Sequence, residues 1–181
     1  MFPLSDEIWQ EVAQNTREIV LKKGETLIPY SSLATTANII VSGSAKKSMI
    51  DSKGSKTAIW FFFQDMFDVA VCFDSYYLEE HTKYEITALE NLVVFQIEKE
   101  KIEDWLERFP AFNRFYRKDI MKSFFLVTEI RSHMLSHTST EFIQYLRKNY
   151  PEIIEKVPLR YIADFMGITP EWLSKIYKKA G

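Results

Sequence analysis

Residues 157–179, VPLRYIADFMGITPEWLSKIYKK, show the clearest structural pattern in this sequence. Apolar residues recur at helical spacing on both sides of Gly167, so the stretch predicts two short helices. Glycine can end the first helix because it enters the left-handed backbone region without steric cost. Thr169 can then cap the second helix, and Pro170 suits its first position, where no N–H is needed. This is the pattern of a helix-turn-helix, whose second helix enters the major groove of DNA.

The second of these helices would have one apolar and one polar face. We expect Leu173 and Ile176 to turn inward, with Ile168 as an apolar wedge in the turn. An ordinary helical hairpin is the alternative interpretation. DNA binding is favoured because cap, glycine, wedge and basic end coincide within about 20 residues. The residues left facing outward are Glu171, Ser174, Lys175, Lys178 and Lys179.

Composition and charge fit a folded chain that contacts phosphate at one end. The 181 residues are 46% hydrophobic, which is enough for a core in one domain or two small ones. The net charge is −2, but residues 140–181 hold seven Lys/Arg and five Asp/Glu, a balance of +2 that leaves −4 for the rest. A basic end on an acidic body is what local contact with nucleic acid requires.

Several functional classes are excluded by what the sequence lacks. The single cysteine, Cys72, cannot form a disulfide within the chain or a multi-cysteine metal site, and we expect it to be buried. His133 and His137 have no evident third ligand, so no metal site is expected. No nucleophile–base or P-loop spacing occurs, so we expect no enzyme activity and no cofactor. No signal segment or 18-residue apolar run is present, so we expect a cytoplasmic protein without a membrane partner.

The N-terminal half has the pattern of short strands separated by turns. Turn signals at Gly24, Gly43 and Gly54 favour an antiparallel sandwich or barrel over a βαβ fold. Eight aromatic residues between positions 60 and 77 could line an apolar effector pocket, but core filling is favoured because aromatic runs are usually core. After a helix at 5–14, the expected strands are 19–21, 25–28, 38–47, 57–63, 82–89 and 92–97.

A long helix follows a shorter one at 100–108. Residues 111–136 contain neither glycine nor proline and predict a helix about 39 Å long. Its apolar stripe is too long and too aromatic for a small domain to cover, so we expect it to pack against a second copy; the alternative is burial against its own sheet. The expected dimer contacts are Phe112, Ile120, Phe124, Val127, Ile130 and Met134, with Met121, Phe125 and Leu135 widening the stripe.

The chain is expected to divide after this helix. Thr138 and Glu141 have the three-residue spacing of a capping box, which predicts a new helix start. The expected parts are a β-roll over 1–109, a dimerisation helix over 110–137 and a helix-turn-helix domain over 138–181.

The order of these parts resembles the Crp–Fnr family of bacterial transcription regulators over essentially the whole chain. KKGETL at 22–27 is similar to the family's KKGExL opening, and NIIVSGS at 38–44 to its YFILSGS strand and turn. YEITALE at 84–90 resembles the strand after the family's ligand cassette. Residues 157–179 resemble the VPLKYIASYLGITPETLSRIRKK style of Bacteroidetes members. The resemblance implies double-stranded DNA and a second copy of the chain as partners, with RNA polymerase as a further candidate.

The ligand cassette departs from the family pattern. In the family, Gly-x-x-x-Gly-Glu and a later Arg-Ser/Thr hold the cyclic phosphate and ribose; here residues 64–69 read QDMFDV. Asp68 stands for the second glycine, Val69 for the glutamate and Thr82 for the arginine, while Lys83 could replace only part of the lost charge. Losing two charge-assisted hydrogen bonds costs on the order of 10²–10⁴ in affinity. We therefore expect a degenerate effector pocket that binds neither cAMP nor cGMP, although another small-molecule effector is open.

The recognition helix keeps part of the family's Arg-Glu-Thr-x-x-Arg pattern. Glu171 matches the glutamate that accepts a hydrogen bond from a base, and Lys175 replaces the arginine that contacts guanine. Pro170 replaces the first arginine, so Arg160 and Thr169 join the candidate phosphate contacts. Trp172 could pack inward or lie against the sugar–phosphate wall, and no β-wing is expected after residue 181.

The expected fold class is therefore α+β: an antiparallel β-roll (a double-stranded β-helix of the cyclic-nucleotide-binding type), a long dimerisation helix, and a winged-helix-like helix-turn-helix lacking much of the wing. The expected function is that of a homodimeric, sequence-specific DNA-binding transcription regulator. The alternative is a ligand-sensing or protein-docking module that no longer recognises DNA specifically.

Overall fold

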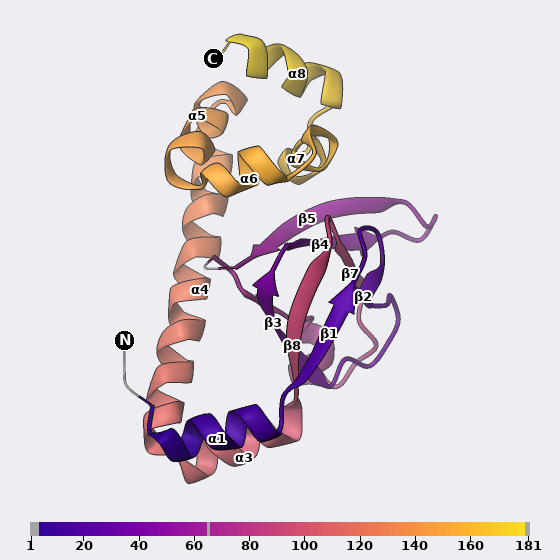
Figure 1. The fold of residues 1–181 in the computed structure, drawn as a ribbon. Coiled ribbons are helices and arrows are strands. Elements are labelled where there is room, and N and C mark those ends of the chain that lie inside the picture. The colour runs from indigo at the N-terminus through magenta and orange to yellow at the C-terminus, as the bar shows by residue number, and fades with distance from the viewer. Residues whose placement is uncertain (1–3, 65, 180–181) are drawn as a thin grey trace.

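One long helix, α4, organises the molecule, with a two-sheet roll beside it and the C-terminal helices at one of its ends (Figure 1). The computed structural model describes residues 4–64 and 66–179, and the side chains of Lys178 and Lys179 lie outside the described part. The expected α+β class with an antiparallel roll is confirmed.

The roll consists of two four-stranded sheets whose pairings are all antiparallel. The first has the order β1 (Arg17–Leu21), β8 (Leu92–Glu98), β3 (Thr36–Ser42) and β6 (Val69–Ala70). The second has the order β2 (Thr26–Ile28), β7 (Tyr84–Ala88), β4 (Ser44–Ile50) and β5 (Lys56–Phe63).

The chain passes between the two sheets at Gly43. This residue has a φ of 86°, and a Cβ placed on it would lie 2.2 Å from the Asn91 carbonyl oxygen, so only glycine fits. The predicted turn or bulge at this position is confirmed by the register shift beside it, between Ile40 and Ser42. The roll interior is filled by buried apolar side chains that include Ile28, Ala45, Phe62, Ile86, Leu92 and Val94.

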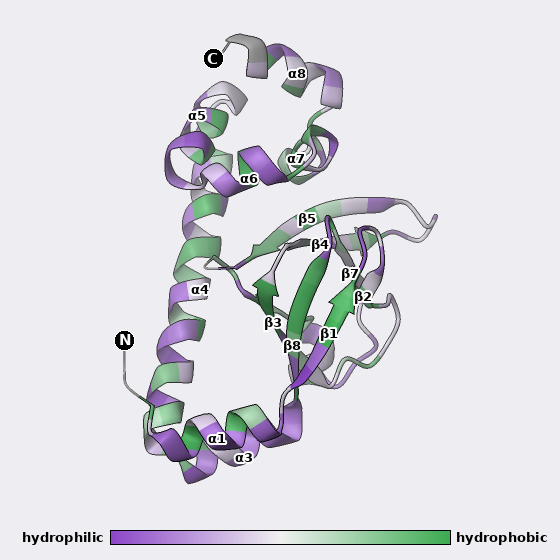
Figure 2. Ribbon diagram, in the orientation of Figure 1, coloured by the Kyte–Doolittle hydropathy of each residue, from purple (hydrophilic) through white to green (hydrophobic). Residues whose placement is uncertain are grey.

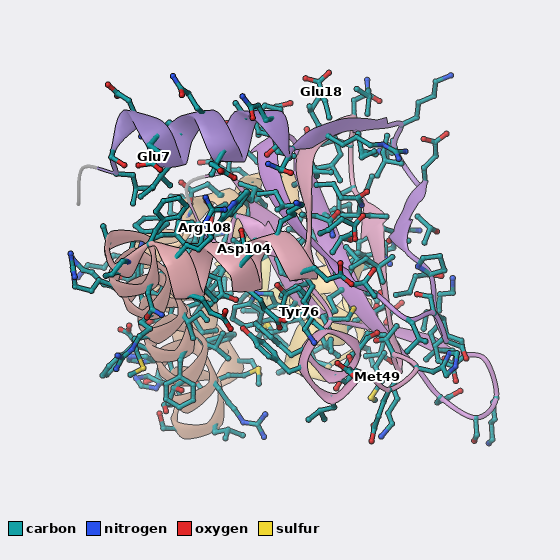
Figure 3. The ribbon with its side chains drawn as sticks, turned by 90° about the horizontal axis from the view of Figure 1, so that it is seen from below. Glu7, Glu18, Met49, Tyr76, Asp104 and Arg108 are labelled. Carbon is teal, nitrogen blue, oxygen red and sulfur yellow. The ribbon has the colours of Figure 1, made fainter. Side chains whose placement is uncertain are left out.

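Helices precede and follow the strands of the roll along the chain. Ser5 caps α1 (Asp6–Gln14) through a hydrogen bond from the Ile8 amide, as its position predicts. Arg108 of α3 (Lys99–Arg108) is bonded to both Asp104 and Glu11, at 2.7 and 3.0 Å, which fastens α3 to α1 (Figure 3). The remaining helices are α2 (Phe73–Leu78), α4 (Pro110–Ser136), α5 (Ser139–Asn149), α6 (Pro151–Lys156), α7 (Leu159–Met166) and α8 (Pro170–Lys179).

Two of these helices were not expected from the sequence. The six residues of α2 are too few to show a helical period within an aromatic run. The second is α6: α5 ends at Asn149, and Pro151 then occupies the first turn of α6, where a missing N–H costs nothing. The predicted capping box of Thr138 and Glu141 at the start of α5 is confirmed.

The α4 helix has apolar residues on both of its sides (Figure 2). Phe112 is buried against Trp105 of α3, and Ile130 is buried in the core of the C-terminal helices, with Met134 packed on the same core. All three were predicted to contact a second copy. The structure corrects that prediction for Phe112 and Ile130, which are buried in their own chain, whereas Met134 is half-buried and its contact with a second copy stays a prediction. The apolar residues left exposed on the other side are Ile120, Met121, Phe124, Phe125, Val127 and Leu135.

The C-terminal helices share their core with the roll. Buried side chains of β5, among them Phe61 and Phe63, lie in one cluster with Ile130 of α4 and with Ile162 and Leu173 of α7 and α8. This packing crosses the junction near residue 137, although α4 does end there. The division into parts at 109 and 137 stays a prediction.

Candidate nucleic-acid interface

The turn between α7 and α8 is built by local chemistry that the sequence displays. Gly167 ends α7 in the left-handed conformation, with φ 65°, and its N–H donates to the Asp164 carbonyl at 3.0 Å. The Thr169 hydroxyl accepts from the Trp172 amide at 3.2 Å and so caps α8. The angle between the two helices is therefore fixed by a glycine, a hydroxyl and a proline.

The outer face of α8 is polar apart from one aromatic side chain. Leu173 and Ile176 are buried, whereas Glu171 and Lys175 are exposed and Ser174 is half-buried. Trp172 is 53% exposed, so it does not pack inward. In Figure 1, α8 lies at the end of the molecule with α7 between it and the roll. Lys178 and Lys179 continue this helix, but their side chains lie outside the described residues.

Arg160 lies on α7, the first helix of the helix-turn-helix, and its side chain contacts the neighbouring Tyr161. Its guanidinium donates to the Tyr161 hydroxyl at 2.7 Å and lies 4.5 Å from the centre of that ring. The same ring lies 4.9 Å from the Lys46 ammonium of β4 in the roll. Arg160 is thus engaged at the contact between α7 and the roll, and its role in DNA binding stays a prediction.

The exposed side of α4 forms an apolar surface suited to contact with another protein chain. Its members are Ile120, Met121, Phe124, Phe125, Val127 and Leu135, which we call the α4 outer face. Phe124 is 63% exposed and Phe125 is 70% exposed, which is unusual for neighbouring phenylalanines on a folded chain. Three of the six predicted dimer contacts, Ile120, Phe124 and Val127, lie on this face.

The predicted effector residues fall into two separate places. Val69 pairs with Ile39 at the edge of the first sheet, and the neighbouring Asp68 carbonyl accepts from the Ile40 amide. Thr82 and Lys83 precede β7 of the second sheet. Among these described residues no hydrogen bond joins Asp68 or Val69 to Thr82 or Lys83. The donors at the second place are already used, because the Thr82 hydroxyl and the Lys83 amide both donate to Asp74, at 3.0 Å each.

Comparison with solved structures identifies the architecture. FixK2 from Bradyrhizobium japonicum superposes with a TM-score of 0.71 at 15% identity, over 91% of this chain and 83% of that one. A CooA mutant from Carboxydothermus hydrogenoformans gives 0.68 at 16% identity, over 98% and 86%. A transcriptional regulator of the crp/fnr family from Eubacterium rectale gives 0.71 at 14% identity, over 97% and 83%. The chain has a Crp–Fnr-like fold.

Similarity to these three structures is low in sequence, at 14–16% identity, and clear in three dimensions. No protein-family model and no curated protein sequence matches this chain. At identities this low, structural similarity establishes only the fold, so activity has to be argued from the residues themselves. Within residues 4–64 and 66–179, no helix has both the length and the apolarity needed to cross a bilayer.

Most of the aromatic run of this Crp–Fnr-like chain fills space, as favoured above, but Phe73 and Tyr77 are 54% and 48% exposed. Phe61 and Phe63 are buried, and Trp60 meets Phe67 and Phe165 edge to face, with ring centres 4.6 and 5.9 Å apart. The cavity left among these rings measures about 10 Å³, which is too small for an organic effector. Phe165 belongs to α7, so these rings also join the helix-turn-helix to the roll.

Two consecutive lysines of β4 were not singled out in the sequence. Lys46 and Lys47 are both buried, on opposite sides of the strand, and burial lowers the pKa of each. Lys46 donates to Ser48 and faces α7, whereas Lys47 lies 4.1 Å from the centre of the Tyr84 ring inside the roll. The sequence did carry a signal for these residues, because two lysines interrupt a strand of otherwise small or apolar residues. Lysine is rarely buried without a partner, so such a position indicates a special role for the side chain.

Asp74 was also missed, and it is the hydrogen-bond partner of Thr82 and Lys83, two of the predicted effector residues. Partial burial alone would raise the pKa of Asp74, but hydrogen bonds from the Lys83 amide, the Ser75 amide and the Thr82 hydroxyl outweigh it and hold this pKa below its usual value. Its carboxylate is therefore charged at neutral pH and lies among donors.

Proposed function

We propose that this chain is a homodimeric, sequence-specific DNA-binding transcription regulator of the Crp–Fnr type, acting in the cytoplasm, with a sensor that does not bind cAMP or cGMP. The observation that carries the proposal is the outer face of α8. It is exposed, it begins with the Thr169 cap, and it presents Glu171, Trp172 and Lys175 on the first two turns. In helix-turn-helix proteins those turns contact base edges.

The chemistry of these side chains suggests how bases would be distinguished. The Glu171 carboxylate can accept a hydrogen bond from the amino group of cytosine, and the Lys175 ammonium can donate to guanine or to phosphate. Trp172 offers an apolar ring for a thymine methyl group or a deoxyribose. Few phosphate contacts are evident on the described side chains, so a single copy would bind weakly.

Pairing of two copies through the α4 outer face would double the contact with DNA. Each of its six side chains keeps a substantial exposed fraction, between 37% and 73%. Burying the exposed part of six such side chains contributes on the order of 5–9 kcal/mol per chain before the entropy cost of association. That is the scale of a stable dimer, and two-fold pairing suits a palindromic operator.

The sensor part of the proposal is supported by the occupied donors at Thr82 and Lys83. A cyclic phosphate would have to displace the Asp74 carboxylate from both. Calorimetry with millimolar cAMP tests this part, and clear binding in the micromolar range would contradict it. RNA polymerase is the further partner that such a regulator would contact once bound to its operator.

The DNA-binding part is tested by gel shift on fragmented genomic DNA of the source organism. The Glu171→Ala, Lys175→Ala double variant should lose the discrete bands that the wild type gives. A matched control, Lys101→Ala with Glu107→Ala, changes the same charges on exposed residues of α3 at the opposite end of the molecule (Figure 1) and should keep them. Equal shifts for all three proteins, abolished alike by moderate salt, would mean non-specific phosphate binding only.

The second candidate function, a sensing or docking module without specific DNA recognition, is favoured by one observation. The helix-turn-helix is packed onto its own roll through Phe165 and Tyr161, an arrangement that also suits a fixed scaffold. The same gel shift separates the two functions, because this module would give no discrete band.

A further inference from the structure

The Asp74 carboxylate is surrounded by donors of its own chain. Oδ1 accepts from the Ser75 amide and from the Thr82 hydroxyl, both at 3.0 Å. Oδ2 accepts from the Lys83 amide at 3.0 Å and lies 3.2 Å from the Thr82 hydroxyl. An oxyanion held by backbone amides and a hydroxyl is the arrangement by which proteins bind free carboxylate or phosphate. Here the oxyanion is a side chain.

The donors in this cluster have no spare capacity for a ligand. Thr82 is 1% exposed, and its single O–H is directed to Asp74 while its oxygen accepts from the Tyr84 amide at 3.1 Å. The Ser75 hydroxyl beside them accepts from the Ala34 amide at 2.6 Å. The cluster therefore ties α2 to the start of β7 and to the loop before β3.

A buried cation, Lys47, acts on the cluster through its charge. Lys47 is 9% exposed, and its ammonium lies over the rings of Tyr84 and Phe73, at 4.1 and 5.9 Å from their centres. Its charge interacts with Cys72 and with Asp74. Burial raises the pKa of the Cys72 thiol, which stays neutral, so the charged group that acts on Lys47 is the Asp74 carboxylate, across a distance longer than a direct ion pair. A buried ammonium without such a partner is strongly unfavourable.

We propose that Asp74 is a built-in anion that occupies the oxyanion site formed by the Thr82 hydroxyl and the Ser75 and Lys83 amides, with the buried Lys47 in its field, and so determines that the sensor takes no anionic ligand. The site accepts a small carboxylate or an inorganic phosphate only when the Asp74 side chain is removed. This inference deepens the sensor part of the proposed function, and its consequence for regulation rests on that function. The binding chemistry itself is independent of DNA.

The test is chemical rescue of thermal stability in the full chain. Asp74→Ala should lower the midpoint of thermal unfolding, and sodium formate or phosphate should restore it saturably by roughly 3–8 °C relative to chloride at equal ionic strength. The wild type should show no oxyanion-specific rise because its site is filled. Asp74→Asn is the matched control, since its amide fills the same space and leaves no room for the added anion.

Two results would overturn the inference. One is an Asp74→Ala protein whose midpoint responds to formate and phosphate no more than to chloride. The other is a wild type that is stabilised by phosphate as strongly as the variant, which would mean that the site is free.

If Asp74→Ala does not fold, the milder Asp74→Asn background carries the test. Lys47→Met should destabilise the wild type, where the ammonium has its partner, and should be neutral or stabilising in the Asp74→Asn background, where it has none. Equal effects in both backgrounds would contradict the assignment.

These outcomes are separable from the proposed function. Rescue without any specific DNA binding would leave the built-in anion standing and remove the regulator. Specific DNA binding without rescue would support the regulator and remove the built-in anion.

Discussion

The α4 outer face gives a prediction whose size follows from the structure. Phe124 keeps 63% of its surface exposed in the single chain, so burying it against a second copy contributes about 1.5–2 kcal/mol. A two-fold interface contains the residue twice. Phe124→Ala should therefore weaken dimerisation by about 3–4 kcal/mol, which is a factor of roughly 10²–10³ in the dissociation constant.

Sedimentation over a concentration series measures this change directly, because the chain of 21.4 kDa and its dimer are well resolved. The thermal midpoint of the dissociated Phe124→Ala protein should stay close to that of the wild-type monomer. Ile130→Ala is the matched contrast on the opposite side of the same helix: it should cost about 2–5 kcal/mol of folding stability, since Ile130 is fully buried in its own chain. A Phe124→Ala dimer as tight as the wild type would refute the assignment of this face.

Three further predictions concern the recognition helix, the roll contact and the sensor. Trp172→Ala should raise the dissociation constant for a selected operator about tenfold, as measured by fluorescence anisotropy. The thermal midpoint should stay unchanged because the ring is exposed. An unchanged affinity would show that Trp172 does not contact DNA. Phe165 is half-buried, so Phe165→Ala should cost about 1.5–3 kcal/mol and separate the melting of the roll from that of the C-terminal helices in calorimetry. A single cooperative transition at the wild-type midpoint would contradict the shared core. The folding free energy that Asp74 contributes should be constant at neutral pH and should be lost as the pH falls below 3.8, through its lowered folded-state pKa. The unfolding free energies of wild type and Asp74→Asn, measured by urea titration, should therefore become equal in strong acid. A difference that persists there would mean that the Asp74 charge is not its source.

The parts of the fold that the sequence predicts well are those set by neighbouring residues. The Gly167 turn, the Thr169 cap and the Thr138–Glu141 capping box each depend on groups within four positions of one another, and all are present. Gly43 belongs with them, because its turn is visible in sequence even though the close approach of Asn91 is not.

For α4, sequence periodicity predicts the helix but not which of its sides is buried in its own chain. Apolar residues occur around most of this helix, so spacing alone could not separate the side that faces the chain from the side left exposed. Phe112 and Ile130 were assigned to the dimer because they continue the same three- and four-residue steps as Phe124. Only the position of α3, α7 and β5 in three dimensions places them inside.

The sensor cluster was missed for a related reason. Asp74 lies eight positions before Thr82 and far from Lys47 in sequence, and a six-residue helix intervenes, so nothing local connects them. An acidic residue within the aromatic run and two lysines in a buried strand were the only signals. Family resemblance directed attention to the substituted positions Asp68 and Val69 instead of to Asp74, which binds Thr82 and Lys83.

Recognition of a DNA sequence by α8 is measured by the ratio of dissociation constants for an operator obtained by in vitro selection and for a shuffled duplex, by fluorescence anisotropy at about 150 mM salt. We expect a ratio of about 10³ or more for the wild type and a ratio near unity for the Glu171→Ala, Lys175→Ala variant. A wild-type ratio near one, or a ratio that the double variant leaves intact, would contradict recognition by α8.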